Sequence, residues 1–188
     1  MDIPQLRAGD SAPQFTATDA MGKPVDLADY KGKFVLLVFL RYSGCPLCNL
    51  TLHRLIMEYP MLADNGCEVI AFIQSDADHI KKDIYGRHKQ RPQFPIIPDE
   101  SRIFYDKYGV GNTSFAKGVA HTILETPYWL KSAFKLGYKP TKVDGDALLV
   151  PASFLVGPDA QEIVQAEYGS SFYDHRTFTS IYEPLIFK

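Results

Sequence analysis

The sequence predicts an α/β fold in which a central mixed β-sheet is flanked by helices. Two continuous apolar runs, Lys33–Leu40 and Cys67–Gln74, are typical of strands that are buried on both faces. Between them lies a segment with the apolar spacing of a helix, and two more apolar runs follow near the C-terminal end. Strands that alternate with helices in this way indicate a layered α/β architecture.

The composition excludes several classes of protein. The chain has 188 residues, a formal net charge of -2 and 46% hydrophobic residues. We therefore expect a single globular domain over residues 1–188, with no electrostatic reason to bind nucleic acid or a membrane surface. The N-terminal sequence MDIPQLRAGD carries early charges and no apolar stretch, so we expect no signal peptide and a cytoplasmic location.

The first half of the chain contains most of the predicted sheet. Residues 1–29 are rich in turns and predict a small N-terminal hairpin extension. The Lys33–Leu40 strand follows, and then a helix over Cys48–Tyr59 that Pro60 limits. Cys67–Gln74 is the second buried strand, and the polar stretch Asp76–Lys89 is predicted to be helical.

The second half predicts shorter elements around an insertion. The expected elements are a strand at Phe94–Ile97, a helix at Ser101–Tyr108, and strands at Leu148–Val156 and Glu162–Ala166. Residues 112–142 fit this alternation poorly, so we interpret them as a helical insertion with a helix near Pro127–Leu136. Two interpretations stay open for this insertion: it covers one sheet edge, or it is a lid over the active site.

The motif Cys45-Pro46-Leu47-Cys48 carries the clearest chemistry in the sequence. It follows a buried strand and opens a helix, whose N-terminus offers free N–H groups and about half a positive elementary charge. Both stabilise a thiolate, and a spacing of three places the second sulfur one turn away, close enough to form a disulfide with the first. Arg41 and the hydroxyl of Ser43 lie just upstream and are candidates for further thiolate stabilisation.

Competing interpretations of the cysteines are weaker. A structural zinc site needs four ligands, and only Cys67 remains, so we expect no metal. We interpret Cys67 as a core residue, and no motif indicates a nucleotide, flavin, haem or other cofactor. A basic cluster, interpreted as a solvated helix face, comprises His79, Lys81, Lys82, Arg87, His88, Lys89 and Arg91.

Three stretches resemble the peroxiredoxin-like branch of the thioredoxin-fold superfamily, which is the alkyl hydroperoxide reductase and thiol-specific antioxidant (AhpC/TSA) branch. They are the opening Leu6–Phe15, the segment Met21–Leu37 that leads into the first core strand, and Val150–Val156. The dithiol follows that strand at the expected place. The segment Arg102–Tyr105 before Gly109-Val110, together with the pair Asp174-His175, is similar to an antioxidant-like subgroup with a Cys-x-x-Cys. The resemblance implies a thioredoxin-like fold and a redox-active dithiol.

The sequence also departs from that branch. Matching the core strand places Arg41 at the branch's proline, Cys45 at its threonine and Cys48 at its peroxidatic cysteine. Pro151 stands where peroxiredoxins carry an arginine, which implies the cis-proline of thioredoxin-like reductases. We therefore expect a cis Val150–Pro151 bond beside Cys45, with Val150 offering its backbone to an extended substrate. The aromatic residue that precedes a thioredoxin dithiol is replaced by Gly44.

The sequence thus predicts a thiol-disulfide oxidoreductase in which Cys45 attacks and Cys48 resolves. One alternative is a thiol peroxidase in which Cys48 reacts with hydroperoxide and Cys45 resolves. Another is a redox-sensing binding module. The implied partners are a protein disulfide or hydroperoxide substrate and a thiol electron donor, either thioredoxin-like or glutathione, and an oligomer is compatible with the resemblance.

Overall fold

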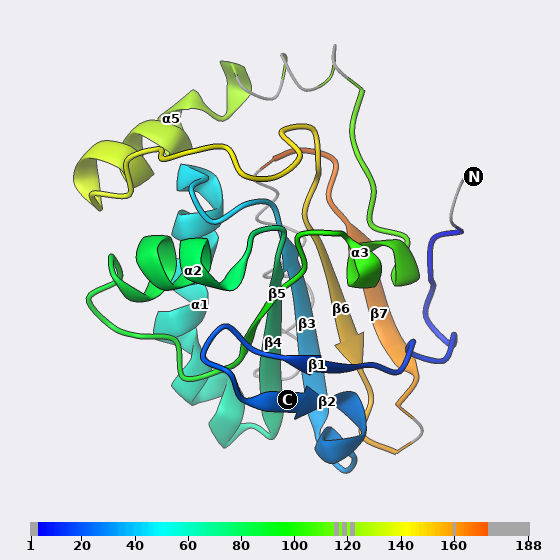
Figure 1. Ribbon diagram of the computed structural model, residues 1–188. Helices are drawn as coiled ribbons and strands as arrows, with labels where there is room; N and C mark the ends of the chain where they lie inside the picture. Colours follow the sequence, from blue (N-terminus) through cyan, green and yellow to red (C-terminus); the bar gives the residue numbers. More distant parts are fainter. Residues whose placement is uncertain (1–3, 115–116, 118–119, 121–122, 160, 173–188) are drawn as a thin grey trace.

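The computed structural model describes residues 4–114, 117, 120, 123–159 and 161–172. Its centre is a five-stranded sheet in the order β5-β4-β3-β6-β7 (Figure 1). Strands β3 (Phe34–Leu40), β4 (Cys67–Ile73) and β5 (Ile96–Pro98) are parallel, while β6 (Ala152–Val156) and β7 (Ile163–Tyr168) run antiparallel to their neighbours. The predicted mixed sheet is confirmed.

The two faces of the sheet are covered differently (Figure 1). Because successive side chains of a strand point to opposite faces, Leu36 and Leu40 of β3 pack in one core cluster and Leu37 and Phe39 in the other. The first cluster lies under α1 (Pro46–Asp64), α2 (Ala77–Ile80) and η2 (Lys81–Tyr85). The second is covered by η1 (Leu27–Tyr30), α3 (Ile103–Lys107) and the hairpin of β1 (Thr16–Thr18) and β2 (Pro24–Asp26).

Aromatic packing fixes the end of β3, where the redox motif begins. Phe39 stacks on Phe72 of β4 with ring centroids 4.4 Å apart. The buried hydroxyl of Tyr105 donates to the carbonyl of Leu40 and, at 3.0 Å, to that of Phe72. Tyr105 thereby fixes the ends of β3 and β4 relative to each other, so the loop that follows β3 begins at a rigidly held residue.

The boundaries of helix α1 and strand β6 differ from those expected from the sequence, each for a physical reason. Helix α1 spans Pro46–Asp64 and runs through the exposed Pro60, which was expected to limit it. The helix continues because Leu62, one half-turn further on, is fully buried in the core under the sheet. Strand β6 begins only at Ala152, since Pro151 has no N–H to donate and the N–H of Val150 is bonded to the carbonyl of Gly111.

The insertion lies across the N-terminal end of α1 (Figure 1). Its described part contains α5 (Thr126–Leu130) continued by η3 (Lys131–Lys135), and the hydroxyl of Ser132 donates to the carbonyl of Pro46. Residues 137–144 that follow form neither helix nor strand. Asp174-His175 lies outside the described residues. None of the helices in the described ranges has the length and apolar character needed to cross a bilayer.

Candidate redox site

The dithiol lies at the start of α1, directly after the turn that leaves β3. Cys45 has extended backbone angles (φ -74°, ψ 120°) and is the residue that caps the helix, and Pro46 fills the first helical position. Proline suits that position because an N–H there has no partner within the helix. Cys45 and Cys48 are both free thiols and are only 2% and 3% exposed.

The surroundings of the two sulfurs separate their acidities. The pKa of Cys45 is lowered to about 6, chiefly because the thiol of Cys48 donates a hydrogen bond to it. Burial opposes this shift, while the charge of Arg41 and the backbone N–H groups of Cys48 and Leu47 add to it. The pKa of Cys48 is raised well above its usual range by burial and by its hydrogen bond to Cys45. At neutral pH the pair therefore holds one thiolate, on Cys45, beside one thiol.

Arg41 supplies the positive charge at the site. Its Nη1 lies 3.6 Å from Sγ of Cys45, and its other terminal nitrogen donates to the carbonyl of Ala147. The guanidinium carbon stands 4.0 Å from the ring centroid of Phe172 and 5.3 Å from that of Tyr42. A guanidinium between two aromatic faces is fixed in orientation and shielded from water, which strengthens its attraction for the thiolate.

The sequence suggested that the hydroxyl of Ser43 stabilises the thiolate. In the structure this hydroxyl faces Asp83 instead. It lies 3.4 Å from the carboxylate of Asp83, and the N–H of Ser43 donates to the hydroxyl of Ser75 at 2.9 Å. The carbonyl of Ser43 accepts a 2.7 Å hydrogen bond from the side chain of Asn49, which also donates to the carbonyl of Cys45 at 3.0 Å. We call residues 41–45, between β3 and α1, the redox loop. Ser43 holds this loop in place through its backbone and side chain together.

A buried chain of hydrogen bonds extends from Asn49 to the insertion. His88 Nε2 lies 2.9 Å from Asn49 Oδ1, and His88 Nδ1 lies 3.1 Å from the hydroxyl of Tyr138, which is itself 3.1 Å from His53 Nδ1. Since Asn49 Nδ2 is used as the donor to the two carbonyls, Oδ1 is the acceptor and His88 donates from Nε2. Burial, aided by the charges of His53 and Arg87, lowers the pKa of His88 to about 4, so the ring is neutral at pH 7.

This chain corrects the interpretation of the basic cluster. His88 was expected on a solvated helix face, but it is only 5% exposed because it pairs with Asn49 on one side and stacks on Tyr138 at a centroid distance of 4.4 Å on the other. Asn49 and Asp83 were not identified from the sequence either. The only sequence signal for Asn49 is its position directly after Cys48, in the first turn of α1.

The prediction of a cis Val150–Pro151 bond is wrong, because the bond is trans. The chain runs straight into β6 here, and the N–H that Val150 would offer to a substrate is occupied, as is the carbonyl of Pro151. The N–H of Val150 donates to Gly111 at 3.2 Å, and the carbonyl of Pro151 accepts from Gly169 at 2.8 Å. The pair therefore joins the sheet to neighbouring segments of the same chain instead of presenting a free edge to a substrate.

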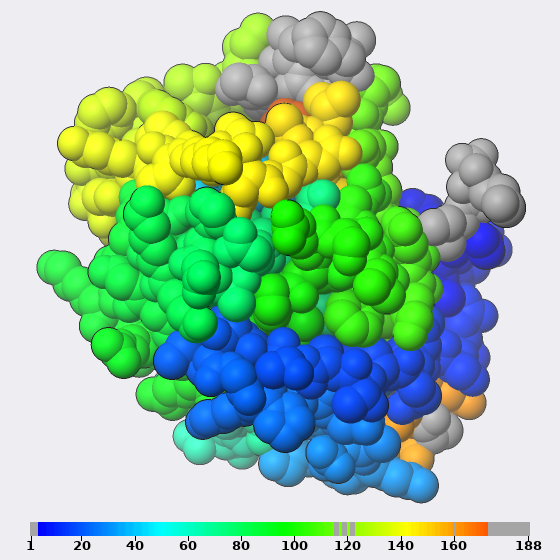
Figure 2. Space-filling model, viewed as in Figure 1, coloured from blue at the N-terminus to red at the C-terminus, as the bar shows by residue number. Residues whose placement is uncertain are grey.

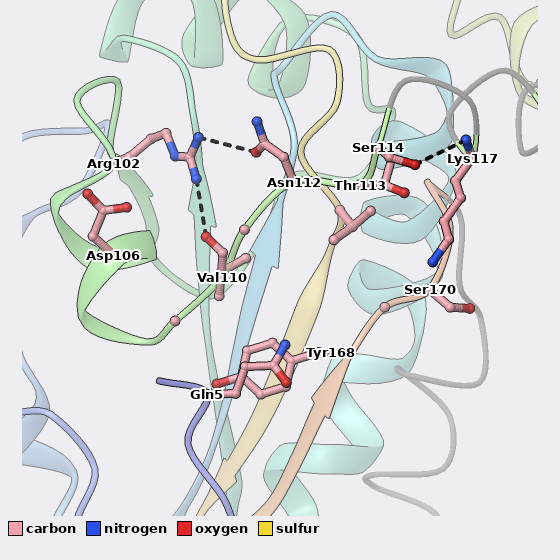
Figure 3. A pocket seen from close by; sticks show the side chains of 14 residues that line it. Gln5, Arg102, Asp106, Val110, Asn112, Thr113, Ser114, Lys117, Tyr168 and Ser170 are labelled. Atoms are coloured by element: carbon pink, nitrogen blue, oxygen red, sulfur yellow. Dashed lines mark hydrogen bonds between the residues drawn. The ribbon is translucent and has the colours of Figure 1, made fainter. Parts of the chain in front are cut away.

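Val150 also lines a polar cavity of about 690 Å³ (Figure 3). The side chains of Arg102, Asn112 and Tyr168 contribute to its wall, and Arg102 donates to Asn112 at 3.2 Å and to the carbonyl of Val110 at 3.3 Å. Neither Cys45 nor Cys48 is among its lining residues. This cavity is therefore separate from the redox site.

Cys67 is the third cysteine and lies in a different environment. It begins β4 and is fully buried in the core. Burial raises its pKa to about 12, so it carries no thiolate near neutral pH. Its place fits the core role expected from the sequence.

A dithiol that opens the helix after the central strand, on a sheet of this order, is the arrangement of thiol redox proteins with a thioredoxin-like fold. The profile of the AhpC/TSA family matches residues 8–165, and the chain belongs to that family.

Similar proteins come from both functional branches. The thiol-disulfide oxidoreductase ResA of Bacillus thuringiensis (strain Al Hakam) is 31% identical over 110 residues, which are 58% of this chain and 62% of the relative. Peroxiredoxin Bcp of Escherichia coli (strain K12) is 28% identical over 111 residues, which are 58% of this chain and 69% of the relative. The crystal structure of peroxiredoxin 6 of Arenicola marina shares the fold with a TM-score of 0.70 at 18% identity, over 96% of this chain and 72% of the other.

Proposed function

We propose that the chain is a thiol-disulfide oxidoreductase in which Cys45 is the attacking thiolate and Cys48 the resolving thiol. The observation that carries this proposal is the difference between the two sulfurs. Cys45 receives the hydrogen bond of Cys48 and has Arg41 Nη1 at 3.6 Å, and these favour its thiolate form. Cys48, whose pKa is raised, keeps its proton until the first bond has formed.

The reaction balances with these two groups and an external thiol. The thiolate of Cys45 attacks one sulfur of a substrate disulfide, the S–S bond breaks, and the other sulfur leaves as a thiolate that takes up a proton. Cys48 then attacks the sulfur of Cys45, the substrate sulfur departs as a thiolate that takes up the proton of Cys48, and a Cys45–Cys48 disulfide forms. The substrate has gained two electrons. A dithiol protein or two molecules of glutathione return them by the reverse exchange.

A second candidate is a thiol peroxidase, and two observations favour it. The N–H of Val150 and the carbonyl of Pro151 are occupied, and Cys45 is almost fully buried, which suits a small substrate. In that case the thiolate of Cys45 attacks the outer oxygen of a hydroperoxide, the O–O bond breaks, and an alcohol or water leaves after protonation. Cys48 then attacks the resulting sulfenic acid, and water is released. The low pKa of Cys45 favours attack by Cys45, whereas the resemblance to peroxiredoxins implies attack by Cys48.

One experiment tests both candidates. The reduced protein is mixed in a stopped-flow instrument with hydrogen peroxide and, in parallel, with a protein disulfide. We expect oxidation by the protein disulfide to be the faster reaction at equal concentration and to end in a Cys45–Cys48 disulfide. Fast oxidation by peroxide alone would favour the peroxidase.

Cysteine variants identify the attacking sulfur in the same experiment. Cys48→Ser is expected to trap a stable mixed disulfide on Cys45, which peptide mass spectrometry locates. Cys67→Ser is the matched control, because the buried thiol of Cys67 takes no part and the variant is expected to turn over like the natural protein. In Cys45→Ser, only Cys48 can form the adduct. If it does so as fast as Cys45 does in Cys48→Ser, the assignment of Cys45 as the attacking sulfur is contradicted.

A further inference from the structure

The last residues of the insertion and the residues that follow it pass over the redox loop. We call residues 137–147 the lid. In Figure 2 the lid, coloured yellow, runs as a band across the upper part of the face shown. Gly44 lies directly beneath it: the N–H of Thr141 donates to the carbonyl of Gly44 at 3.3 Å. A Cβ at Gly44 would collide with the hydroxyl of Thr141 and stand 2.7 Å from the carbonyl of Lys142.

One buried carboxylate joins the lid to the redox loop. Asp83, on η2, is 2% exposed. It accepts a 2.8 Å hydrogen bond from the hydroxyl of Thr141 in the lid, and the hydroxyl of Ser43 in the redox loop lies 3.4 Å from the same oxygen. Asp83 thus holds both segments at one point, and on the loop side this point is two residues from Cys45.

The two ends of the lid are held more firmly than its middle. At its far end the N–H of Asp146 donates to the side chain of Gln74 at 2.7 Å, and the carboxylate of Asp146 pairs with Arg102 at 3.3 Å. Arg87 donates to the carbonyl of Lys139 at 2.7 Å, Tyr138 meets His88, and Arg41 donates to the carbonyl of Ala147. Residues 139–143 are exposed on their outer side, and no helix or strand hydrogen bonds run along the lid. The middle of the lid, residues 139–143, therefore has few buried contacts and no regular ladder, and segments of this kind open locally at low free energy.

From these contacts we propose that the lid decides which oxidants reach Cys45. While Thr141 is bonded to Asp83, the sulfur is accessible only to small molecules, and a disulfide carried by a protein reacts only after this bond has broken and the lid has opened. The proposal rests on the proposed function in one respect, namely that Cys45 is the attacking sulfur. It makes the Asp83–Thr141 pair a specificity-determining contact of the same site.

The test measures access to Cys45 with two reagents of different size. The reduced full chain reacts with iodoacetamide, which is small, or with the aromatic disulfide 5,5′-dithiobis(2-nitrobenzoate), whose released thiolate gives the rate. Peptide mass spectrometry locates the alkyl group on Cys45 in the first case and the Cys45–Cys48 disulfide in the second. Thr141→Val removes the hydroxyl at nearly constant shape. Thr141→Ser keeps it. The matched control is Thr16→Val, which removes a Thr–Asp hydrogen bond of the same 2.8 Å length, to Asp26, in the hairpin on the other face of the sheet.

We expect Thr141→Val to raise the rate with the aromatic disulfide by about tenfold, as for the loss of one hydrogen bond, and the rate with iodoacetamide by less. Thr141→Ser and Thr16→Val are expected to stay within about twofold of the natural protein. The rates are measured as a function of pH. In Thr141→Val the rate at the high-pH plateau should rise while the midpoint of the curve stays the same, because the access to Cys45 changes and the pKa of its thiol does not.

An unchanged plateau in Thr141→Val, an equal rise in Thr16→Val, or a rise explained by a shifted midpoint would overturn the proposal. Should Thr141→Val not fold, amide exchange of the natural protein decides instead. The Thr141 N–H is expected to exchange through a local opening well below the free energy of global unfolding, and exchange only through global unfolding would overturn the lid. Absence of turnover with both hydrogen peroxide and a protein disulfide would refute the proposed function while leaving these access measurements valid.

Discussion

The thiolate of Cys45 depends on two side chains that act differently. Cys48 donates a hydrogen bond within the motif itself, and Arg41 contributes a charge from the start of the turn that leaves β3. The hydrogen bond of Cys48 is the larger of the two effects, so the acidity of the site is set mainly by its own second thiol. The same thiol later becomes the resolving nucleophile, and its two roles are therefore linked.

This order of effects gives a prediction for the pH profile of Cys45. In the natural protein the midpoint of Cys45 alkylation by iodoacetamide is expected near the pKa of about 6. Cys48→Ala should move the midpoint upward toward the ordinary value near 8.5, and Arg41→Met should move it upward by less. Cys48→Ser keeps a donor and should move it least. A larger shift in Arg41→Met than in Cys48→Ala would contradict the assignment.

Helix α1 carries both cysteines and contains a proline in its fourth turn. Pro60 lies inside the helix and is exposed, so it removes a backbone hydrogen bond without packing in the core. The rest of the helix compensates through its buried face, which includes Leu52, Leu55 and Leu62. The proline therefore leaves α1 less stable than its packing allows.

Pro60→Ala is expected to raise the free energy of unfolding of the reduced protein by about 1–3 kcal/mol, because alanine restores the donor and has the best helix propensity. Denaturant titration followed by circular dichroism measures the change. Pro60→Gly should gain about 1 kcal/mol less. Destabilisation by both substitutions would mean that the proline ring makes a contact on which the fold depends.

Helices, strands and the dithiol were predictable from the sequence where the periodicity of apolar residues, or the spacing of the cysteines, indicates them. The apolar run of β3, the helical spacing of α1 and the three-residue spacing of the cysteines are local patterns, and they indicated the sheet and the dithiol. The contacts of Asn49 with His88 and of Thr141 with Asp83 join residues 39 and 58 positions apart. No local pattern encodes such pairs. The cis bond at Pro151 was inferred from a resemblance, and the hydrogen bonds of its neighbours favour trans.

At the scale of the molecule, the lowered pKa of Cys45 makes folding stability depend on pH. The native pKa is about 6, and an unfolded cysteine titrates near 8.5. A group with a depressed native pKa stabilises the fold fully above the unfolded pKa, and this contribution is lost as the pH falls through the native pKa. The affected window is therefore pH 6 to 8.5.

We expect the free energy of unfolding of the reduced natural protein, relative to Cys45→Ser, to rise with pH across this window by roughly 3 kcal/mol. Urea titrations in the presence of a reductant, at half-unit steps of pH, measure the difference. A difference that stays constant, or that falls as the pH rises, would show that the Cys45 thiolate is not favoured by the native state.

The chain has a single tryptophan, Trp129, and it lies in α5 of the insertion. Its ring is half-buried, packs against the core cluster that contains both cysteines, and has Phe134 at a centroid distance of 6.2 Å. All the tryptophan fluorescence of the protein therefore comes from α5, a short distance before the lid in the sequence. The colour and intensity of that emission provide a built-in optical signal for movement of the insertion, readable in real time and without a label.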